Sequence, residues 1–181
     1  QIRPLDLSPF PDVPRTLDPS PEQVAGVQNL AYRLRGTRLG FLADSVGLGK
    51  TITALGTAWF LQRAGMLGPV EARDRPRWAV VAPRKLFHQW RSDASRIGMT
   101  EPLACLNRHK LERETDTRAI ETLAGYQLLL VDEAHEVLRN RGNKLWRHLR
   151  AWLRDQPTAM VLLISATPWN NSREDIFSYL S

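Results

Sequence analysis

Hydrophobic and polar positions follow two different periods along most of this chain. Short, mostly apolar runs are typical of strands buried on both faces, and longer amphipathic stretches are typical of helices. The predicted strands are 39–43, 78–82, 103–106, 127–131 and 159–164, and the predicted helices are 22–34, 50–64, 84–97, 110–123, 143–153 and 172–180.

This order of elements predicts an α/β fold, in which a mostly parallel sheet carries helices on both faces. Residues 1–20 are rich in proline and lack periodicity, so we expect an extended lead-in there, followed by one domain over 21–181. The chain has 181 residues, of which 43% are hydrophobic, enough to bury a sizeable core. Ligands of parallel sheets bind beyond the carboxyl ends of the strands, so candidate chemistry is expected there.

The first such end carries a candidate phosphate-binding loop. Residues 44–51, with the sequence DSVGLGKT, connect a predicted strand to a predicted helix. Glycines let backbone N–H groups approach phosphate oxygens, Lys50 can bridge the β- and γ-phosphates, and the hydroxyl of Thr51 can hold Mg²⁺. Asp44 stands where the general pattern of such loops has its first glycine.

A second strand end carries acidic residues. Asp132 and Glu133 follow the apolar run 128–131, and a Mg-ATP site needs such carboxylates opposite its phosphate loop. We expect Asp132 to anchor Mg²⁺ together with Thr51, and Glu133 to orient or deprotonate the attacking water. The alternative for Glu133 is a solvated carboxylate at the start of a helix.

Two further strand ends lie at the same predicted edge of the sheet. Pro83, Arg84 and Lys85 follow the strand 78–82, where they could contact a phosphodiester backbone; a solvated loop is the alternative. Ser165 and Thr167 follow the strand 159–164. Four motifs therefore converge on one edge.

The charge balance indicates a polyanionic partner. The formal net charge is +6 and the isoelectric point about 10.1, with arginine supplying most of the basic charge. The planar guanidinium group suits phosphate recognition. An arginine-rich source proteome would explain the same balance, and this alternative stays open.

The number of cysteines and the hydropathy of the chain indicate the cellular compartment of the protein. Cys105 is the single cysteine, which excludes an internal disulfide and fits a reducing compartment. The longest apolar runs are too short to span a bilayer, and no signal peptide is visible. We therefore expect a cytoplasmic protein without a membrane partner, associated with the nucleoid if it is bacterial.

Five segments together resemble the motifs of one motor family. Residues 21–30 (PEQVAGVQNL) resemble a glutamine motif, and residues 43–51 resemble the phosphate loop A-D-E-x-G-L-G-K-T. Residues 80–83, together with Trp90 further along the chain, resemble motif Ia. Residues 132–135 (DEAH) with 139–140 (RN) resemble motif II, and 165–171 (SATPWNN) resemble motif III. The chain over 21–180 is thus similar to the first RecA-like lobe of superfamily 2 helicases, and among them to the SNF2-like DNA translocases.

The resemblance implies ATP-dependent translocation on double-stranded DNA, with ATP and Mg²⁺ as cofactors. It implies that Gln23 reads the adenine edge and that His135 couples the nucleotide site to Ser165 and Thr167; a surface glutamine and a simple cap or core histidine are the alternatives. A second RecA-like lobe, which would bring a catalytic arginine, is not found in this sequence. The implied cofactor-binding residues are Gln23, Asp44, Gly47, Leu48, Gly49, Lys50 and Thr51.

Rival interpretations stay open at this point. Ala166 replaces the glycine of the SNF2-like motif III, and S-A-T is the commoner form in the wider superfamily. A motor subunit of a restriction or phage-defence system is therefore an alternative, as is a nucleotide-binding module without turnover. The loop sequence G-L-G-K-T and the R-N extension favour the SNF2-like interpretation over an RNA helicase.

Overall fold

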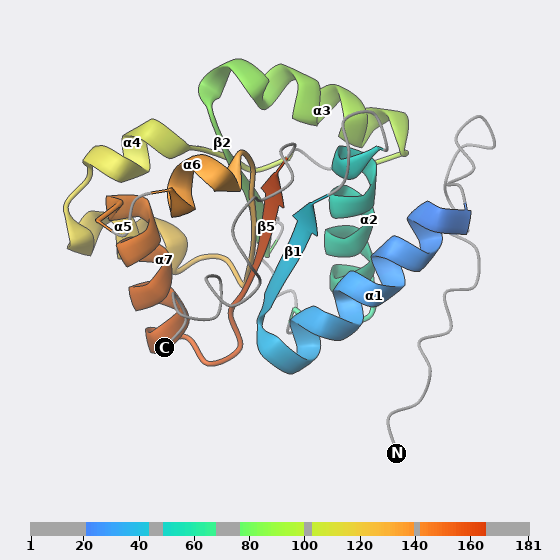
Figure 1. Cartoon of the computed structure of the whole chain (residues 1–181), viewed down its shortest axis with the longest axis horizontal. Coiled ribbons are helices and arrows are strands. Elements are labelled where there is room, and N and C mark those ends of the chain that lie inside the picture. Colours follow the sequence, from blue (N-terminus) through green and yellow to red (C-terminus); the bar gives the residue numbers. More distant parts are fainter. Residues whose placement is uncertain (1–20, 44–48, 68–76, 100–102, 140–141, 166–181) are drawn as a thin grey trace.

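The predicted parallel sheet is present in a computed structural model, which describes residues 21–43, 49–67, 77–99, 103–139 and 142–165. Within these ranges five parallel strands form one sheet in the order β1-β5-β4-β2-β3 (Figure 1). The strands are β1 (Leu39–Ala43), β2 (Trp78–Ala82), β3 (Cys105–Asn107), β4 (Leu128–Val131) and β5 (Met160–Ser165). The predicted α/β class is therefore confirmed.

The continuous apolar runs of the strands are explained by helices on both sides of the sheet. Successive side chains of a strand point to opposite faces, and in β4 Leu128 and Leu130 pack into one core while Leu129 and Val131 pack into the other. All four side chains are fully buried. A strand in this position needs apolar residues at every position, which is the pattern that the sequence shows.

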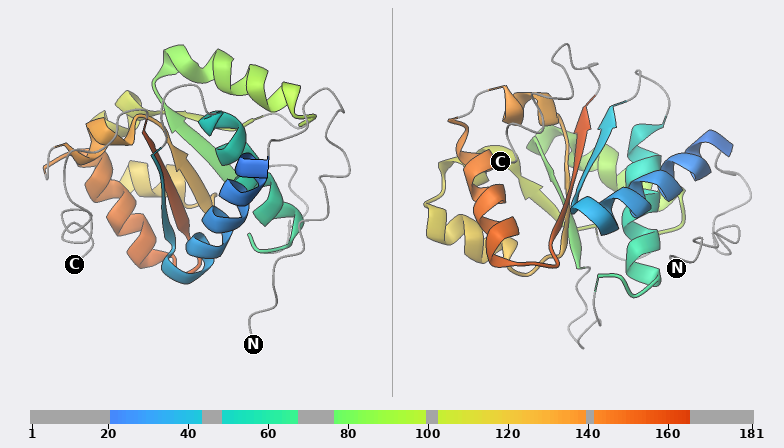
Figure 2. Two further views of the ribbon diagram at one scale, coloured as in Figure 1. Left: turned by 45° about the vertical axis from the view of Figure 1, so that its right-hand side comes forward. Right: turned by 60° about the horizontal axis from the view of Figure 1, so that its bottom comes forward.

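The direction in which the chain crosses the sheet decides which face each helix covers. The chain first moves outward from β1 through β2 to β3, and then returns through β4 to β5. Because crossovers between parallel strands are right-handed, the outward and returning connections lie on opposite faces. One face carries α1 (Pro21–Thr37), α2 (Lys50–Arg63) and α3 (Phe87–Arg96), and the other carries α4 (Arg108–Arg113), α5 (Asp116–Leu123), α6 (Ala134–Leu138) and α7 (Lys144–Asp155) (Figures 1 and 2).

One helix prediction was wrong. The segment 110–123, expected as a single helix, is divided between α4 and α5, because Glu114 and Thr115 have extended backbone conformations. The Thr115 hydroxyl accepts a hydrogen bond from the backbone N–H of Arg118 at 3.4 Å. Threonine satisfies the exposed donors of a helix start in this way, so a new helix begins here.

Other element boundaries differ in smaller ways. The helix expected over 84–97 begins with a 3₁₀ turn, η2 (Arg84–Leu86), before α3. The short α6, directly after the acidic motif, was not predicted. The helix expected over 172–180 and the lead-in 1–20 lie outside the described residues.

The basic segment of α7 lies on a solvated face, as its spacing indicates. Arg147, Arg150 and Arg154 are exposed, while His148 on the opposite side is buried and its Nε2 lies 2.8 Å from Oδ1 of Asp116 in α5. The hydrogen bond with His148 lowers the pKa of the Asp116 carboxyl group, and Arg147 adds to this effect. The contact joins two helices that cover the same face.

No helix in the described part of the chain has both the length and the apolar character needed to cross a membrane.

Candidate nucleotide-binding site

The strand register brings the predicted motifs to one edge of the sheet. Ala43 at the end of β1 is paired with Ser165 at the end of β5, and Val131 at the end of β4 is paired with Leu163. Val131 is also paired with Val81, next to the end of β2. The carboxyl ends of β1, β2, β4 and β5 therefore lie at one edge of the sheet.

Gly49 lies at the end of the predicted phosphate loop and is the N-cap residue of α2. Its backbone is left-handed, with φ 71° and ψ 32°, a conformation that favours glycine. A Cβ atom at this position would also collide with the side-chain amide nitrogen of Gln23. Lys50 and Thr51 then form the first turn of α2, where backbone N–H groups favour anions. Asp44, Gly47 and Leu48 lie outside the described residues.

Gln23 reaches this loop because α1 and α2 approach each other closely. A Cβ at Gly26 of α1 would lie 3.2 Å from Cγ2 of Thr53 in α2, so the small residue at position 26 permits the approach. The structure thus places the side-chain amide of Gln23 beside Gly49, at the end of the predicted phosphate loop. Helix α1, which precedes the loop in the sequence, therefore forms an adjacent wall of the site.

Asp132 leaves β4 with both carboxylate oxygens bonded. Oδ1 accepts the backbone N–H of Glu133 at 2.8 Å, and Oδ2 accepts the indole N–H of Trp90 in α3, also at 2.8 Å. The backbone N–H of Asp132 donates to the carbonyl oxygen of Val81 in the neighbouring β2 at 2.9 Å. Trp90, which follows the motif Ia segment, is buried, and the sequence did not indicate its bond to Asp132.

Glu133 has a strained backbone at the start of α6. Its φ of 52° and ψ of 44° place it in the left-handed region, which is uncommon for a residue with a side chain. Such strain persists where the surrounding structure enforces it, and it is frequent at functional sites. At this turn the chain leaves the direction of β4, and α6 begins beside the end of β5.

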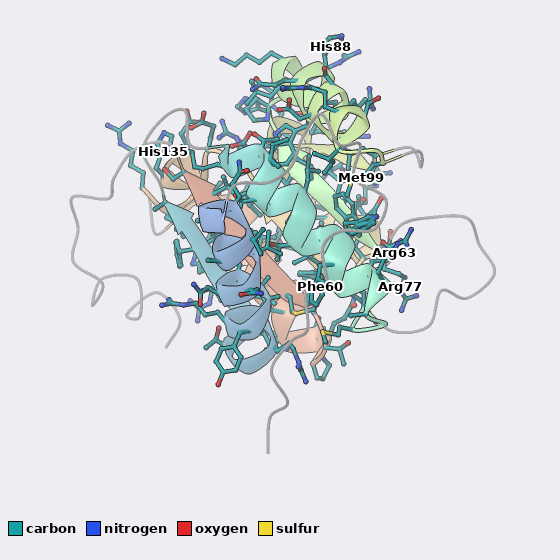
Figure 3. All side chains as sticks on the ribbon, turned by 90° about the vertical axis from the view of Figure 1, so that its right-hand side faces the viewer. Phe60, Arg63, Arg77, His88, Met99 and His135 are labelled. Carbon is teal, nitrogen blue, oxygen red and sulfur yellow. The ribbon has the colours of Figure 1, made fainter. Side chains whose placement is uncertain are left out.

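His135 lies between two predicted functional groups. Its Nδ1 is 3.2 Å from Oγ of Ser165 and 3.3 Å from Oε2 of Glu133. A protonated Nδ1 can donate to either oxygen, whereas an unprotonated one can only accept from the Ser165 hydroxyl. Figure 3 shows His135 near the end of the sheet, away from Phe60 and Arg63 at the far end of α2. Thr167 lies outside the described residues.

Arg108 is a buried charge behind this site that the sequence did not indicate. It is 4% exposed and forms an ion pair with Glu136 of α6, and its Nε lies 3.8 Å from a carboxylate oxygen of Glu112. Burial raises the pKa of Glu136, but the hydrogen bond and charge of Arg108 outweigh it, so the pKa is lowered overall. Arg108 thereby holds α6, which begins after Glu133, against α4.

The three residues predicted to contact nucleic acid differ in how far they are exposed to solvent. Arg84 and Lys85 are exposed in η2, whereas Pro83 is buried, so its ring shapes the turn and only the two basic side chains face solvent. Arg84 and Lys110 line an open cavity of about 320 Å³ beyond β2 and β3. Lys110, which no sequence motif indicated, thus lies near Arg84 among the basic side chains at this edge.

No family model matches the chain. Among curated proteins it is similar to ATP-dependent DNA helicase DDM1 of Arabidopsis thaliana, with 24% identity over 87% of this chain and 24% of that protein. It is also 26% identical to the uncharacterized ATP-dependent helicase YqhH of Bacillus subtilis, over 90% of this chain and 29% of that protein. The lymphoid-specific helicase of Homo sapiens is 24% identical over 88% of this chain and 20% of that protein. The chain thus spans less than a third of the length of these relatives.

Among solved structures, the chain is similar to the SWI2/SNF2 ATPase core of Sulfolobus solfataricus in complex with double-stranded DNA. The TM-score is 0.69 at 17% identity, over 96% of this chain and 36% of that one. This likeness concerns the fold and extends over nearly the whole chain. The strand order and this likeness show a RecA-like helicase fold, and in sequence the chain is similar to ATP-dependent helicases of the SNF2 type.

Proposed function

We propose that this chain is the ATP-binding lobe of an SNF2-type motor that moves along double-stranded DNA at the expense of ATP. One observation carries the proposal: four residues, Gln23, Lys50, Asp132 and Glu133, come together at one edge of the sheet. The names of the relatives, which are ATP-dependent helicases, support the same conclusion.

The residues present fit a magnesium ion. Mg²⁺ prefers oxygen ligands and is usually held by one or two carboxylates together with phosphate oxygens and waters. Asp132 supplies a carboxylate whose two oxygens each accept one N–H, so further acceptor positions remain, and Thr51 supplies a hydroxyl in the first turn of α2. When bound, Mg²⁺ would neutralise charge that develops on the phosphate oxygens.

Each remaining residue has a role in the proposal. The amide of Gln23 hydrogen-bonds the adenine edge, and Lys50 binds the β- and γ-phosphates. Glu133 orients the attacking water and accepts its proton as the γ-phosphoryl group is transferred. His135, placed between Glu133 and Ser165, links the chemistry to the segment after β5. The roles of Asp44, Gly47, Leu48 and Thr167 stay predictions.

Hydrolysis at full rate requires a second RecA-like lobe in this proposal. Such a lobe would bring an arginine onto the transferring phosphoryl group, and an arginine of this kind contributes about 10³–10⁵-fold to the rate. The 181-residue chain alone is therefore expected to bind Mg-ATP and to hydrolyse it only slowly. Nucleotide affinity from calorimetry, compared with phosphate release with and without duplex DNA, tests this. Robust DNA-stimulated ATPase activity of the pure chain would contradict the need for a second lobe.

Binding to DNA is expected to go through backbone phosphates and to be independent of base sequence. Changing Arg84 and Lys85 together to alanine should reduce the slope of log affinity against log salt by about 0.9 for each phosphate that the protein no longer neutralises. The measurement is duplex DNA binding at several salt concentrations by a protein that carries this chain and a second lobe. ATP affinity should not change, because neither side chain belongs to the phosphate loop.

A charge-matched control is available on α1. Arg33 and Arg35 are exposed near the carboxyl end of α1, which leads into the opposite, amino-terminal edge of the sheet. Their double replacement by alanine removes the same charge and should leave the salt slope nearly unchanged. Equal slopes for the two double variants would place the DNA track elsewhere on the lobe.

The proposal places the protein with DNA in the cytoplasm, at the nucleoid if it is bacterial. Ala166 in the motif III segment keeps one alternative of the same class, a motor subunit of a restriction or phage-defence system. Nuclease or methylase motifs in a longer sequence would favour that alternative.

A further inference from the structure

The indole N–H of Trp90 has a charged acceptor at the proposed metal site. Trp90 is 2% exposed on α3, and its Nε1 donates to Oδ2 of Asp132 at 2.8 Å, joining residues 42 positions apart in sequence. The rest of its ring packs in the core that α1, α2 and α3 share with the sheet. One side chain thus connects this apolar core to the carboxylate that would anchor Mg²⁺.

Burial by itself does not supply a partner for a tryptophan N–H in this protein. The indole nitrogens of Trp146 and Trp152 are also buried, and neither has a hydrogen-bond partner among the described residues. Both rings pack in the core on the other face of the sheet. A buried donor without a partner loses the hydrogen bonds that it would make to water. Trp90 differs from Trp146 and Trp152 because its buried N–H has an acceptor, the carboxylate of Asp132.

The two donors on Asp132 fix the orientation of its carboxylate. The torsion about the Cβ–Cγ bond of aspartate is broad, so one bonded oxygen would leave the group free to turn. The Glu133 N–H holds Oδ1 and the Trp90 indole holds Oδ2, so both oxygens are restrained. Hydrogen bonds to a charged acceptor are stronger than neutral ones, particularly where water is excluded.

We propose that Trp90 is a positioning residue for the metal site, which holds the Asp132 carboxylate in its metal-binding orientation before Mg-ATP arrives. This inference rests on the proposed function of the chain. Groups that orient metal ligands typically change metal affinity by about 10–100-fold when they are removed. Because Trp90 acts through Asp132, its removal should change the requirement for Mg²⁺ rather than the affinity for metal-free nucleotide.

The test is Trp90→Phe, which removes the N–H donor and retains an aromatic ring. ATP affinity of the 181-residue chain is measured by calorimetry over a series of Mg²⁺ concentrations and in EDTA. We expect the half-saturating Mg²⁺ concentration to rise about 10-fold or more, with the affinity in EDTA unchanged. An unchanged or lower Mg²⁺ requirement would overturn the inference.

Trp152→Phe is the matched control, since it makes the same change at a buried ring whose N–H has no partner among the described residues. It should lower thermal stability without raising the Mg²⁺ requirement. An equal rise in both variants would show a general packing effect and would also overturn the inference. In an Asp132→Ala background, Trp90→Phe should add no further change in Mg²⁺ requirement, because the group it positions is gone.

A measurement on the unsubstituted chain decides the question if Trp90→Phe does not fold. The indole ¹⁵N–¹H resonance of Trp90, assigned through its neighbours in α3, should shift when Mg²⁺ is added in the presence of ATP. A resonance that does not respond to the metal overturns the inference alone. If the unsubstituted chain binds no ATP at any Mg²⁺ concentration, the proposed function fails and the inference fails with it.

Discussion

Replacement of Glu133 by glutamine is expected to leave Mg-ATP binding intact and to lower hydrolysis by about 10²–10⁴-fold, the usual contribution of a general base. Glutamine has the same shape but cannot accept the proton of the attacking water. Its amide also fits the surroundings of Glu133, whose Oε2 lies 3.3 Å from Nδ1 of His135. The loss is therefore expected in the turnover number and not in the affinity.

The measurement compares nucleotide affinity with single-turnover hydrolysis, in a protein that carries this chain and a second lobe. Glu121→Gln is the control, since Glu121 is an exposed carboxylate on α5 and its replacement makes the same change in charge. Glu133→Gln should lower the rate of hydrolysis by about 10²–10⁴-fold, whereas Glu121→Gln should leave it nearly unchanged. An equal loss of ATP binding and hydrolysis in Glu133→Gln would remove Glu133 from the chemical role and leave it a structural one.

Lys50→Ala is expected to weaken Mg-ATP binding by about 100-fold or more and to abolish turnover, because in the proposed function its ammonium group donates hydrogen bonds to the charged β- and γ-phosphates. Lys50 is the first residue of α2, directly after the left-handed Gly49, and no other lysine of the sequence follows such a loop. A hydrogen bond to a charged group contributes about 1.5–3 kcal/mol, and each 1.4 kcal/mol corresponds to about a tenfold change in affinity. Loss of the ammonium group should therefore dominate binding.

A lysine in the same helical position elsewhere provides the control. Lys144 is the first residue of α7, and it follows an asparagine cap in place of a glycine loop. Lys144→Ala should leave ATP affinity unchanged, which separates the phosphate interaction from the general effect of removing a charge at a helix start. Calorimetric titration of the two variants measures the difference. Full affinity in Lys50→Ala would contradict the assignment of the phosphate loop.

The sheet and the chemical motifs were predictable because their signals are local in sequence. The run 128–131 is apolar at every position, which is the requirement of a strand buried on both faces, and it is followed at once by Asp132 and Glu133. Parallel strands place such ends together, so the approach of Ser165 to His135 follows from the order of the elements. These features need no knowledge of distant contacts.

Predictions were weaker where the local pattern permits two outcomes. A continuous amphipathic pattern over 110–123 is compatible with one helix or two, and the hydroxyl of Thr115 decides for two by capping the second. The strained conformation of Glu133 is likewise set by its position between β4 and α6. Glutamate has no intrinsic preference for a left-handed backbone, so no sequence rule predicts it.

The sequence by itself determined the α/β class, the strands and the position of the acidic residues at the end of a strand, because each depends on neighbouring residues and on a short period. The phosphate loop stays a prediction from the same kind of local signal. Only the tertiary structure decided that Trp90 donates to Asp132, that Arg108 pairs with Glu136, and that Gln23 lies against Gly49. These contacts join residues 26 to 42 positions apart on different helices and loops. Their partners are selected by how the helices pack on the sheet, and packing is a property of the whole fold that a local pattern does not contain.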